Sequence, residues 1–352
     1  PQRVPPGERS VAVFPWGLPL GSCVRSLGAP WPPSAGCDFG WLCISVACGW
    51  GTTENGGMHW IRQTVPRGWM LWVVWLAVGL VSEGAAQEAA TVRDSQTLCV
   101  VTYNLRYASP TGPNAWPERR PMMVELIRRL DPDVMGTQEG LYQQLKELAS
   151  DLPQYDWIGL GRDGGSRGEF MAVFYRRARL EPLAFDHFWL SDTPEVIGSA
   201  TWGNRNRRMV TWVQFLDRST GQKFYVWNTH LDHEVQRARE KSAQLIRERL
   251  ARLPEDGPVL LLGDFNAAAG DNPVYEILTA DGFLRDTWSV AKVRIGERIG
   301  TFNGFERVPV GGPRIDWILV RGAVEVDRVE ISDWQKEGRF PSDHFPVAAW
   351  LR

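Results

Sequence analysis

The sequence predicts an α/β protein in which β-sheets are packed between helices. From Thr97 to Arg352, short apolar segments of strand length alternate with segments whose apolar residues recur at helical spacing. Several strand-like segments are apolar on both faces, as is typical of strands covered on both sides of a sheet. These patterns together predict one α/β domain of about 255 residues.

The predicted strands are short and rich in aliphatic and aromatic residues. They are expected at 98–103, 133–136, 171–175, 210–215, 224–228, 258–262, 315–320 and 346–351.

Four amphipathic segments separate some of these strands and are predicted to be helices. The first begins at Pro117, and the fourth begins at Pro273 with Asp271 as its cap and stops at Gly282. The apolar stripes of the first three are Met123, Leu126, Ile127 and Leu130; Leu141, Leu145, Leu148 and Leu152; and Ala238, Leu245, Ile246, Leu250 and Leu253.

Residues 1–57 lack this alternating pattern. They mix Pro, Gly, Trp and Cys without periodicity, and the spacing of their four cysteines matches no metal-binding motif. We expect this segment to be untranslated upstream sequence or a disordered stretch. Because Cys99 is the single cysteine beyond residue 48, we expect it to be a buried thiol in a domain without an internal disulfide.

Residues 58–86 have the three-part layout of a secretory signal peptide. Two arginines precede an apolar core at 69–81, and small residues follow at 84–86. This core is shorter than the ~20 residues that a membrane-spanning helix needs. We therefore expect Met58 to be the start and the domain to be secreted or periplasmic, with a retained membrane anchor as the alternative.

The charge of the predicted domain is balanced. Residues 97–352 hold 33 Lys and Arg and 35 Asp and Glu, a difference of −2. Binding to duplex DNA depends on neutralising many phosphates with cationic side chains. The composition therefore disfavours duplex DNA and leaves oligonucleotides, nucleotides, sugar phosphates or phospholipid headgroups.

Polar side chains cluster where the predicted strands end or begin. Asn104, Gln138-Glu139, Asn228-Thr229-His230 and Asp264-Phe265-Asn266 follow strands, whereas Asp316 and Asp343-His344 precede them. If the last two strands run antiparallel to the others, all six clusters meet at one edge. Each alone fits a turn or a cap, but six together predict a functional site.

The residue types at this edge indicate the chemistry. Carboxylate and amide oxygens are the ligands that Mg²⁺ or Mn²⁺ prefers. Phosphoryl transfer needs an oriented water molecule and donors for the phosphate oxygens. The clusters therefore predict a divalent-metal-dependent phosphoester hydrolase.

A series of motifs in the domain is similar to those of one known superfamily. The motifs are YNLRY (103–107), GTQEG (136–140), RGEFMAVFY (167–175), FWLSDTPE (188–195), RMVTW (208–212), NTHLDH (228–233), GDFNA (263–267), TFNGF (301–305), RIDWILV (314–320) and SDHFPV (342–347). Their order resembles the endonuclease/exonuclease/phosphatase superfamily, in the style of its exported bacterial members. The resemblance implies a DNase I-like, four-layer α/β sandwich with two packed mixed sheets flanked by helices.

The resemblance also implies roles for the residues that would handle the metal and the water. Glu139 matches the principal metal ligand of the superfamily, with Asn104 and Asp343 as further ligands. Asp264 matches the group that orients or deprotonates the attacking water, and Asn266 the residue that holds it.

Other positions match groups that contact phosphate. His344 resembles the phosphate-contacting histidine, with Asp316 fixing its tautomer and favouring its protonated form. His230 matches a second donor to a phosphate oxygen. Asn104, Arg106 and Arg208 are expected to bind substrate, although an ion pair would equally explain each arginine. Glu169 either supports the metal ligands or is structural.

The substrate is not determined by these motifs, because one fold hosts many functions. A sphingomyelinase-like lipid phosphodiesterase and a noncatalytic binding protein on the same fold are the alternatives. We expect a monomer that needs no protein partner.

Overall fold

The computed structural model describes residues 96–254 and 257–352. The expected signal peptide at 58–86 and the segment 1–57 lie outside the described residues. Among the described helices, none has the length and apolar character needed to span a membrane.

Two mixed sheets form the centre of the domain. The seven-stranded sheet has the order β12 (Val293–Ile295), β14 (Val326–Ile331), β15 (Val347–Leu351), β1 (Leu98–Asn104), β2 (Val134–Gln138), β6 (Val173–Arg176) and β4 (Tyr155–Ile158). The six-stranded sheet has the order β11 (Arg285–Asp286), β13 (Asp316–Arg321), β10 (Val259–Asp264), β9 (Lys223–His230), β8 (Met209–Asp217) and β7 (Leu180–Trp189). A short pair, β3 (Gly140–Leu141) and β5 (Glu169–Phe170), stands beside them.

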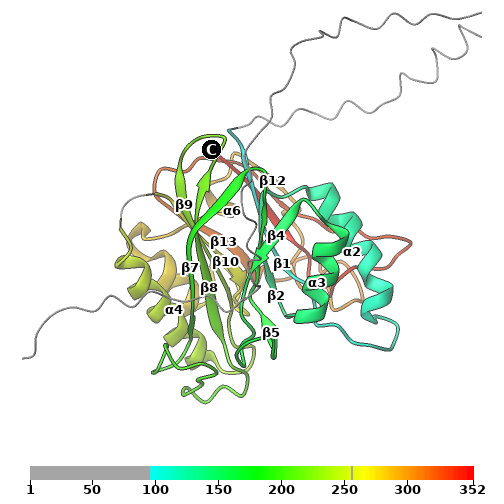
Figure 1. Ribbon diagram of the computed structural model, residues 1–352, viewed down its shortest axis with the longest axis horizontal. Helices are drawn as coiled ribbons and strands as arrows, with labels where there is room; N and C mark the ends of the chain where they lie inside the picture. The colour runs from blue at the N-terminus through cyan, green and yellow to red at the C-terminus, as the bar shows by residue number, and fades with distance from the viewer. Residues whose placement is uncertain (1–95, 255–256) are drawn as a thin grey trace, which may run out of the picture. The chain divides into compact units, whose positions relative to one another are not determined.

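Helices cover the outer faces of the two sheets. Figure 1 shows α2 (Trp116–Leu130) and α3 (Tyr142–Asp151) on one side of the sheets and α4 (Gln236–Ala251) on the other. The shorter α5 (Pro273–Thr279) packs against α4, and α6 (Thr287–Val290) lies near β13. The predicted four-layer sandwich of two packed mixed sheets flanked by helices is confirmed.

Three hydrophobic cores join these layers, and strand periodicity explains them. In β1, Val100 faces the core between the two sheets, whereas its neighbours Cys99 and Val101 face α2 and α3. A third core joins α4 and α5 to the six-stranded sheet. Because successive side chains point to opposite faces, a strand buried on both sides must be apolar throughout. The expectation that Cys99 is buried is confirmed.

The predicted helices and strands are mostly present, and their limits shift by a few residues. The assignment of Asp271 as the cap of the fourth helix is wrong, because the side chain of Asn272 accepts the hydrogen bond from Val274 N. That helix ends at Thr279, and a 3₁₀ turn covers Ala280–Gly282 instead. The sequence did not indicate β4, β7 or β14, nor the short strands β3, β5, β11 and β12. Seven of the ten residues of the edge strand β7 are half-buried or exposed, and the strand contains Pro182, so it lacks the apolar run of a central strand.

The two sheets approach closely beneath the edge that carries the polar clusters. A Cβ atom on Gly136 would lie 2.0 Å from Leu262 Cδ1 and 2.8 Å from Asn228 Cγ of the other sheet, so a larger residue would displace these buried side chains. Gln138 Nε2 donates to Asn228 Oδ1 at 2.7 Å across the same interface. Both amides are fully buried and link the sheets, so they do not belong to an open site.

Candidate active site

Strand register places three of the predicted residues side by side. Asp264 ends β10, and its direct partners are His230 on the parallel strand β9 and Asp316 on the antiparallel strand β13. In the other sheet, Asn104 ends β1 beside the end of β2, and Glu139 follows immediately. The predicted antiparallel orientation of the last strands is confirmed, which brings the six clusters to one edge.

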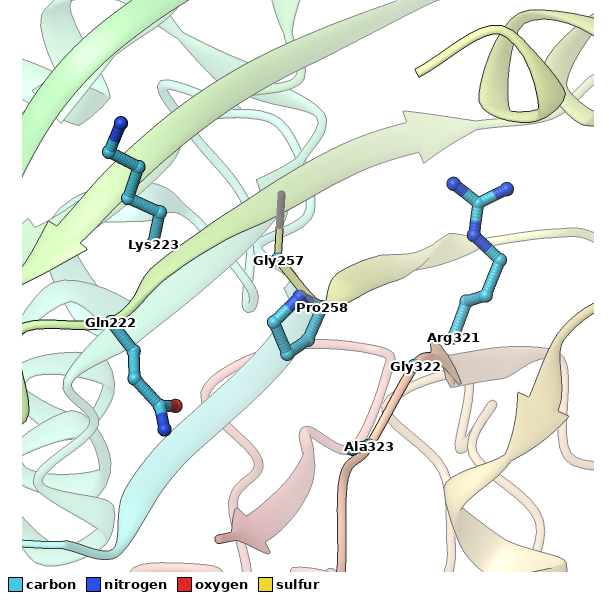
Figure 2. A pocket seen from close by; sticks show the side chains of 7 residues that line it. All are labelled: Gln222, Lys223, Gly257, Pro258, Arg321, Gly322 and Ala323. Carbon is cyan, nitrogen blue, oxygen red and sulfur yellow. The ribbon is translucent and has the colours of Figure 1, made fainter. Parts of the chain in front are cut away.

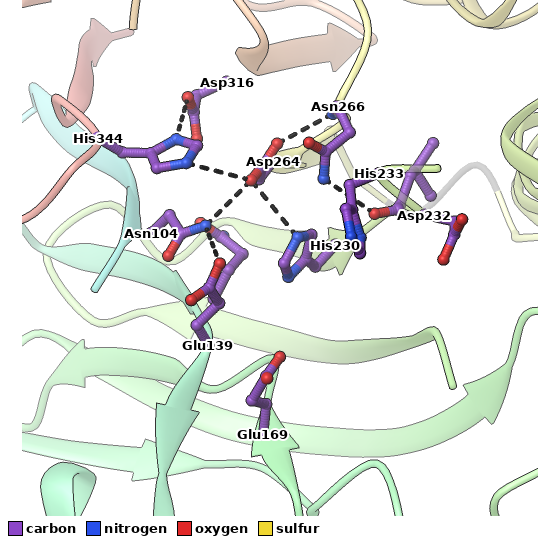
Figure 3. A network of polar contacts seen from close by, with 12 residues as sticks. Asn104, Glu139, Glu169, His230, Asp232, His233, Asp264, Asn266, Asp316 and His344 are labelled. Carbon is purple, nitrogen blue, oxygen red and sulfur yellow. Dashed lines mark hydrogen bonds and ion pairs between the residues drawn. The ribbon is translucent and has the colours of Figure 1, made fainter. Parts of the chain in front are cut away.

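Asp264 is the centre of the polar network in Figure 3. Its Oδ2 accepts a hydrogen bond from Asn104 Nδ2 at 3.0 Å and lies 3.5 Å from His230 Nε2 and 3.7 Å from His344 Nε2. Its Oδ1 accepts from the backbone N–H of Asn266 at 2.9 Å. This buried carboxylate is therefore held from several sides by N–H groups.

Charge and burial set the protonation of this group. Burial raises the pKa of Asp264 to about 7, with the charge of Asp316 adding to the effect. Burial by itself lowers the pKa of His344, but the carboxylates of Asp316 and Asp264 together raise it to about 10. Its Nδ1 lies 3.0 Å from Asp316 Oδ2. His344 is therefore protonated at neutral pH, as expected from its pairing with Asp316.

His230 differs from His344 in its protonation. Burial lowers the pKa of His230 well below its usual value, and the charge of Arg208 lowers it further. Its Nδ1 is buried without a hydrogen-bond partner among the described residues. His230 is therefore neutral at pH 7 and can donate through one ring nitrogen only.

A second group of carboxylates lies beside Asp264. Asp343 Oδ2 is 3.4 Å from Arg106 Nη1, and Glu139 Oε2 is 3.9 Å from the same atom. Burial raises the pKa of Asp343, and the nearby charge of Glu139 raises it further. Two neighbouring carboxylates with one partly exposed arginine between them form a donor set that suits a hard divalent cation.

The predicted role of Asn104 is only partly supported by its position. Its Nδ2 donates to both Glu139 and Asp264, and its Oδ1 accepts from the backbone N–H of Arg106 at 2.9 Å. The side chain is fully buried and does not line the cavity. In this structure both polar atoms of Asn104 are used within the protein, so its side chain supports Glu139 and Asp264, and direct substrate binding by Asn104 stays a prediction.

Asp264, Asp316 and His344 could also hold a metal ion. They each present one ligand atom, and these atoms lie within 4.8 Å of one another. His344 Nδ1 and Asp316 Oδ2 are engaged with each other at 3.0 Å, however, and Asp316 does not line the cavity. Glu139 and Asp343 are therefore the better candidates.

Three of the seven non-glycine residues with positive φ in the described part of the chain lie at this edge. Arg106, Glu139 and Asn266 have φ values of 54°, 61° and 48°, in the left-handed region that residues other than glycine rarely adopt. Such strain persists where the surrounding structure holds a side chain in a required direction, and it clusters at functional sites. These three backbone conformations therefore lie at the site that the carboxylates and histidines define.

A cavity of about 330 Å³ opens over these groups. Its lining consists of Arg106, Tyr107, Glu139, Arg162, Glu169, Asn206, Arg208, His230, His233, Asp264, Asn266, Phe302, Asp343 and His344. A larger cavity of about 580 Å³ is shown in Figure 2 and is lined by Gln222, Lys223, Gly257, Pro258, Arg321, Gly322 and Ala323. The described lining of this larger cavity holds no carboxylate or histidine, whereas the smaller cavity is lined by several of both.

Arg208 and its neighbours form one side of the active-site cavity. Arg208 Nε is 3.5 Å from Asp232 Oδ2, and an Nη atom of Arg208 is 3.0 Å from His233 Nδ1. Asp232 Oδ1 also accepts from the backbone N–H groups of Glu234 and Val235 just before α4. Arg208 thus has an ion-pair partner and also reaches the cavity.

Two arginines at the site were not among the residues predicted from the sequence. Arg162 lines the cavity and pairs with Glu169, whereas Arg119 lies fully buried in α2. Arg119 donates five hydrogen bonds to backbone carbonyl groups, among them those of Arg106 and Pro341. It therefore fixes the two loops that carry Arg106 and Asp343. The pair Arg119-Arg120 at the helix start gave no sign of which arginine is buried.

The fold and site together define a hydrolase of the α/β sandwich class, and comparisons with known proteins agree. The model of the Endonuclease/Exonuclease/phosphatase family matches residues 101–344. The chain therefore belongs to this family, whose phosphatase and phosphodiesterase members are hydrolytic enzymes.

Solved structures of bacterial proteins are similar over the described domain. A family protein from Bacteroides thetaiotaomicron is 35% identical, with a TM-score of 0.69 over 72% of this chain and 94% of that chain. A mannosyl-6-phosphatase from the same species is also 35% identical, with a TM-score of 0.67 over 72% of this chain and 99% of that chain.

A more distant relative is Tyrosyl-DNA phosphodiesterase 2 of Danio rerio. It is 25% identical over 237 residues, which cover 61% of this chain and 57% of the relative. The matched regions span between 50% and 65% of the length of the curated relatives.

Proposed function

We propose that this protein hydrolyses phosphoester bonds by attack of an activated water molecule, with Mg²⁺ or Mn²⁺ as its cofactor. The observation that carries the proposal is the position of Asp264. Its buried carboxylate faces the cavity beside two histidines and a separate carboxylate pair. Family members that are phosphoesterases support the same reaction class.

The side chains around the cavity divide the reaction between them. Asp264 accepts a proton from the attacking water, because a base with a pKa near the working pH is effective. Asn266 orients Asp264 through its backbone N–H. His230 and the protonated His344 donate to the nonbridging oxygens, where charge develops during the reaction.

The cofactor would be held by Glu139 and Asp343. A bound divalent cation polarises the phosphoryl group and balances its negative charge. The half-exposed guanidinium of Arg106, now next to both carboxylates, is then available to the substrate phosphate. Asn104 orients the Glu139 and Asp264 carboxylates by donating to both.

A phosphoester panel on the full chain tests this proposal. The panel contains bis-(p-nitrophenyl) phosphate, p-nitrophenyl phosphate, short oligonucleotides and sphingomyelin, each with Mg²⁺, Mn²⁺ or chelator. We expect metal-dependent turnover of at least one substrate and its loss in Glu139→Ala. If the protein hydrolysed none of these substrates and bound no metal, the noncatalytic alternative would be favoured instead.

We also propose that the protein is exported and acts as a monomer. The layout of residues 58–86 supports export. Fractionation of expressing cells tests it: the mature chain should begin near Gln87 and appear outside the cytoplasm. Recovery of the full-length chain in membranes would favour a retained membrane anchor.

Light scattering on the purified protein measures its mass in solution and so tests whether it is a monomer.

A further inference from the structure

One wall of the cavity is built from residues that the hydrolytic reaction does not use. Arg162 comes from the segment before β5, Glu169 is the first residue of β5, and Asn206 comes from the loop between β7 and β8. Arg162 Nη1 donates to Glu169 Oε2 at 2.6 Å, and Nη2 lies 3.5 Å from Asn206 Oδ1. In Figure 3, no hydrogen bond or ion pair joins Glu169 to the Asp264 network.

The charges of this wall are already balanced. Arg162 is paired with Glu169, and Arg208 is paired with Asp232. A second phosphate group would therefore find no unpaired arginine here. A polyanion such as a nucleic acid is disfavoured for the same reason, and the domain as a whole carries a slight negative excess.

The same wall offers hydrogen-bond donors and acceptors side by side. Glu169 Oε1 accepts no hydrogen bond from the described residues, and the side chain is 17% exposed. The side-chain amide of Asn206, which lines the cavity beside Arg162, carries both a donor and an acceptor. A hydroxyl group can both donate and accept, so neighbouring hydroxyls satisfy such a mixed surface best.

The remaining cavity lining and its size agree with a small, ring-shaped group. Phe302 and Tyr107 line the cavity and are 49% and 38% exposed, so each presents an aromatic surface to a bound molecule. The volume of about 330 Å³ lies at the lower end of the ~300–1,000 Å³ range of small-molecule sites. A monomeric leaving group fits this space better than a polymer.

We propose that the substrates are phosphate monoesters of small polyhydroxy compounds, that is, sugar phosphates, and that Arg162, Glu169 and Asn206 bind the hydroxyls of the leaving group. This inference rests on the proposed phosphoesterase function. The bond between phosphorus and the ester oxygen breaks, and a bond from phosphorus to the water oxygen forms. The sugar leaves as an alcohol with a proton that derives from water, and inorganic phosphate is the other product.

The test compares two substrate types in the full chain with Mg²⁺. Glucose 6-phosphate and mannose 6-phosphate carry hydroxyls on the leaving group, whereas p-nitrophenyl phosphate carries none. The variant is Glu169→Gln, which keeps the shape and removes the charge that orients Arg162. Asp163→Asn is the matched control, because it makes the same change in the same loop on a residue outside the cavity lining that pairs with Arg207.

We expect wild-type protein to hydrolyse at least one hexose phosphate. In Glu169→Gln, kcat/KM for that substrate should fall at least tenfold, mainly through KM. Turnover of p-nitrophenyl phosphate and the Mg²⁺ concentration for half-maximal rate should change less than threefold. Asp163→Asn should match wild type on both substrates. Arg162→Met should repeat the selective loss.

Other outcomes overturn the inference. An equal loss on both substrates, or a raised Mg²⁺ requirement, would mean that Glu169 supports the catalytic groups. Wild-type turnover of p-nitrophenyl phosphate or of diesters without turnover of hexose phosphates would refute the substrate class and leave the proposed function intact. Absence of turnover on every phosphoester would refute the proposed function itself.

Discussion

Asp264 and Asp316 are direct partners in the antiparallel pairing of β10 and β13, so their two carboxylates share one face of the sheet at its buried end. The charge of Asp316 raises the pKa of Asp264 and also holds the proton on His344. One buried carboxylate thus sets the protonation of both the base and a phosphate donor.

Asp316→Asn should therefore move the whole pH–rate profile to lower pH. Without the negative charge, the pKa of Asp264 falls, so the acidic limb moves down. The pKa of His344 also falls, so the basic limb moves down from its value near 10. Measurements of kcat/KM for p-nitrophenyl phosphate against pH test this. If the variant were less active but both limbs of its pH–rate profile stayed in place, the effect of Asp316 on Asp264 and His344 would be contradicted.

Asp264→Asn should fold as well as wild type and lose at least a hundredfold in kcat. General-base catalysis contributes ~10²–10⁴-fold. Because Asp264 is buried and its pKa is raised, removing the charge should leave the thermal midpoint unchanged or slightly higher. Turnover assays and thermal melts test the two statements separately. Turnover near the wild-type rate would refute the role of Asp264.

Glu139→Ala and Asp343→Asn should each weaken Mg²⁺ binding at least tenfold, because each removes one of the two carboxylates that face Arg106. Calorimetric titration of Mg²⁺ tests this without an activity assay. Asp163→Asn serves as the control for a general loss of negative charge. Unchanged affinity in both site variants would favour the group of Asp264, Asp316 and His344 as the metal site.

Removal of residues 1–86 should leave folding and activity unchanged. Every residue that lines the cavity, and every residue of the three hydrophobic cores, lies beyond residue 97. Thermal melting and a phosphoester assay on protein that begins at Gln87 test this. A truncated chain that aggregates or melts well below the full chain would place residues 1–86 within the folded unit.

Asp217→Asn should destabilise the protein at neutral pH, because Asp217 Oδ2 accepts from Arg179 Nη2 at 2.8 Å in a largely buried pair. Burial raises the pKa of Asp217, but the bonds from Arg179 and Ser219 outweigh it, so the pKa lies below its usual value. Breaking such a pair costs ~3 kcal/mol.

The pH dependence of this loss has a defined sign. A carboxyl group with a depressed folded-state pKa stabilises above its unfolded pKa of ~3.9 and loses that effect as pH falls. The wild type and Asp217→Asn should therefore converge in stability in strong acid, measured by urea unfolding. The exposed pair of Glu181 with Arg218 is the control, and Glu181→Gln should change stability by under ~1 kcal/mol. A constant difference at every pH would contradict the linkage.

Much of the site could be predicted from the sequence because its residues lie at the ends or starts of strands. Asp264 and Asp316 stand at strand limits that follow from local apolar patterns, and the later strands are antiparallel as expected. The cap at Asn272 was missed by one residue, because Asp271 and Asn272 have equally suitable side chains. Only the backbone geometry, with Asn272 in an extended conformation, distinguishes them.

Residues whose role depends on distant partners could not be assigned in this way. Gln138 and Asn228 belonged to the predicted polar clusters. These two residues are 90 positions apart in sequence, and the hydrogen bond between them joins the two sheets. Arg119 is indistinguishable from Arg120 in the sequence, yet only Arg119 is buried and bonded to the loops of the site. Arg162 was likewise missed, because its partner Asn206 lies in another loop.

The sequence by itself determined the strand and helix alternation, the edge where the chemistry lies, and the set of carboxylates and histidines. Those features follow from local periodicity and from side-chain chemistry. The tertiary structure alone decided which polar groups face the cavity and which are buried. Asn104, for example, is buried and donates hydrogen bonds to Glu139 and Asp264. The tertiary structure also set the raised pKa of Asp264, because burial and the charge of Asp316 act only when strands distant in sequence are packed together.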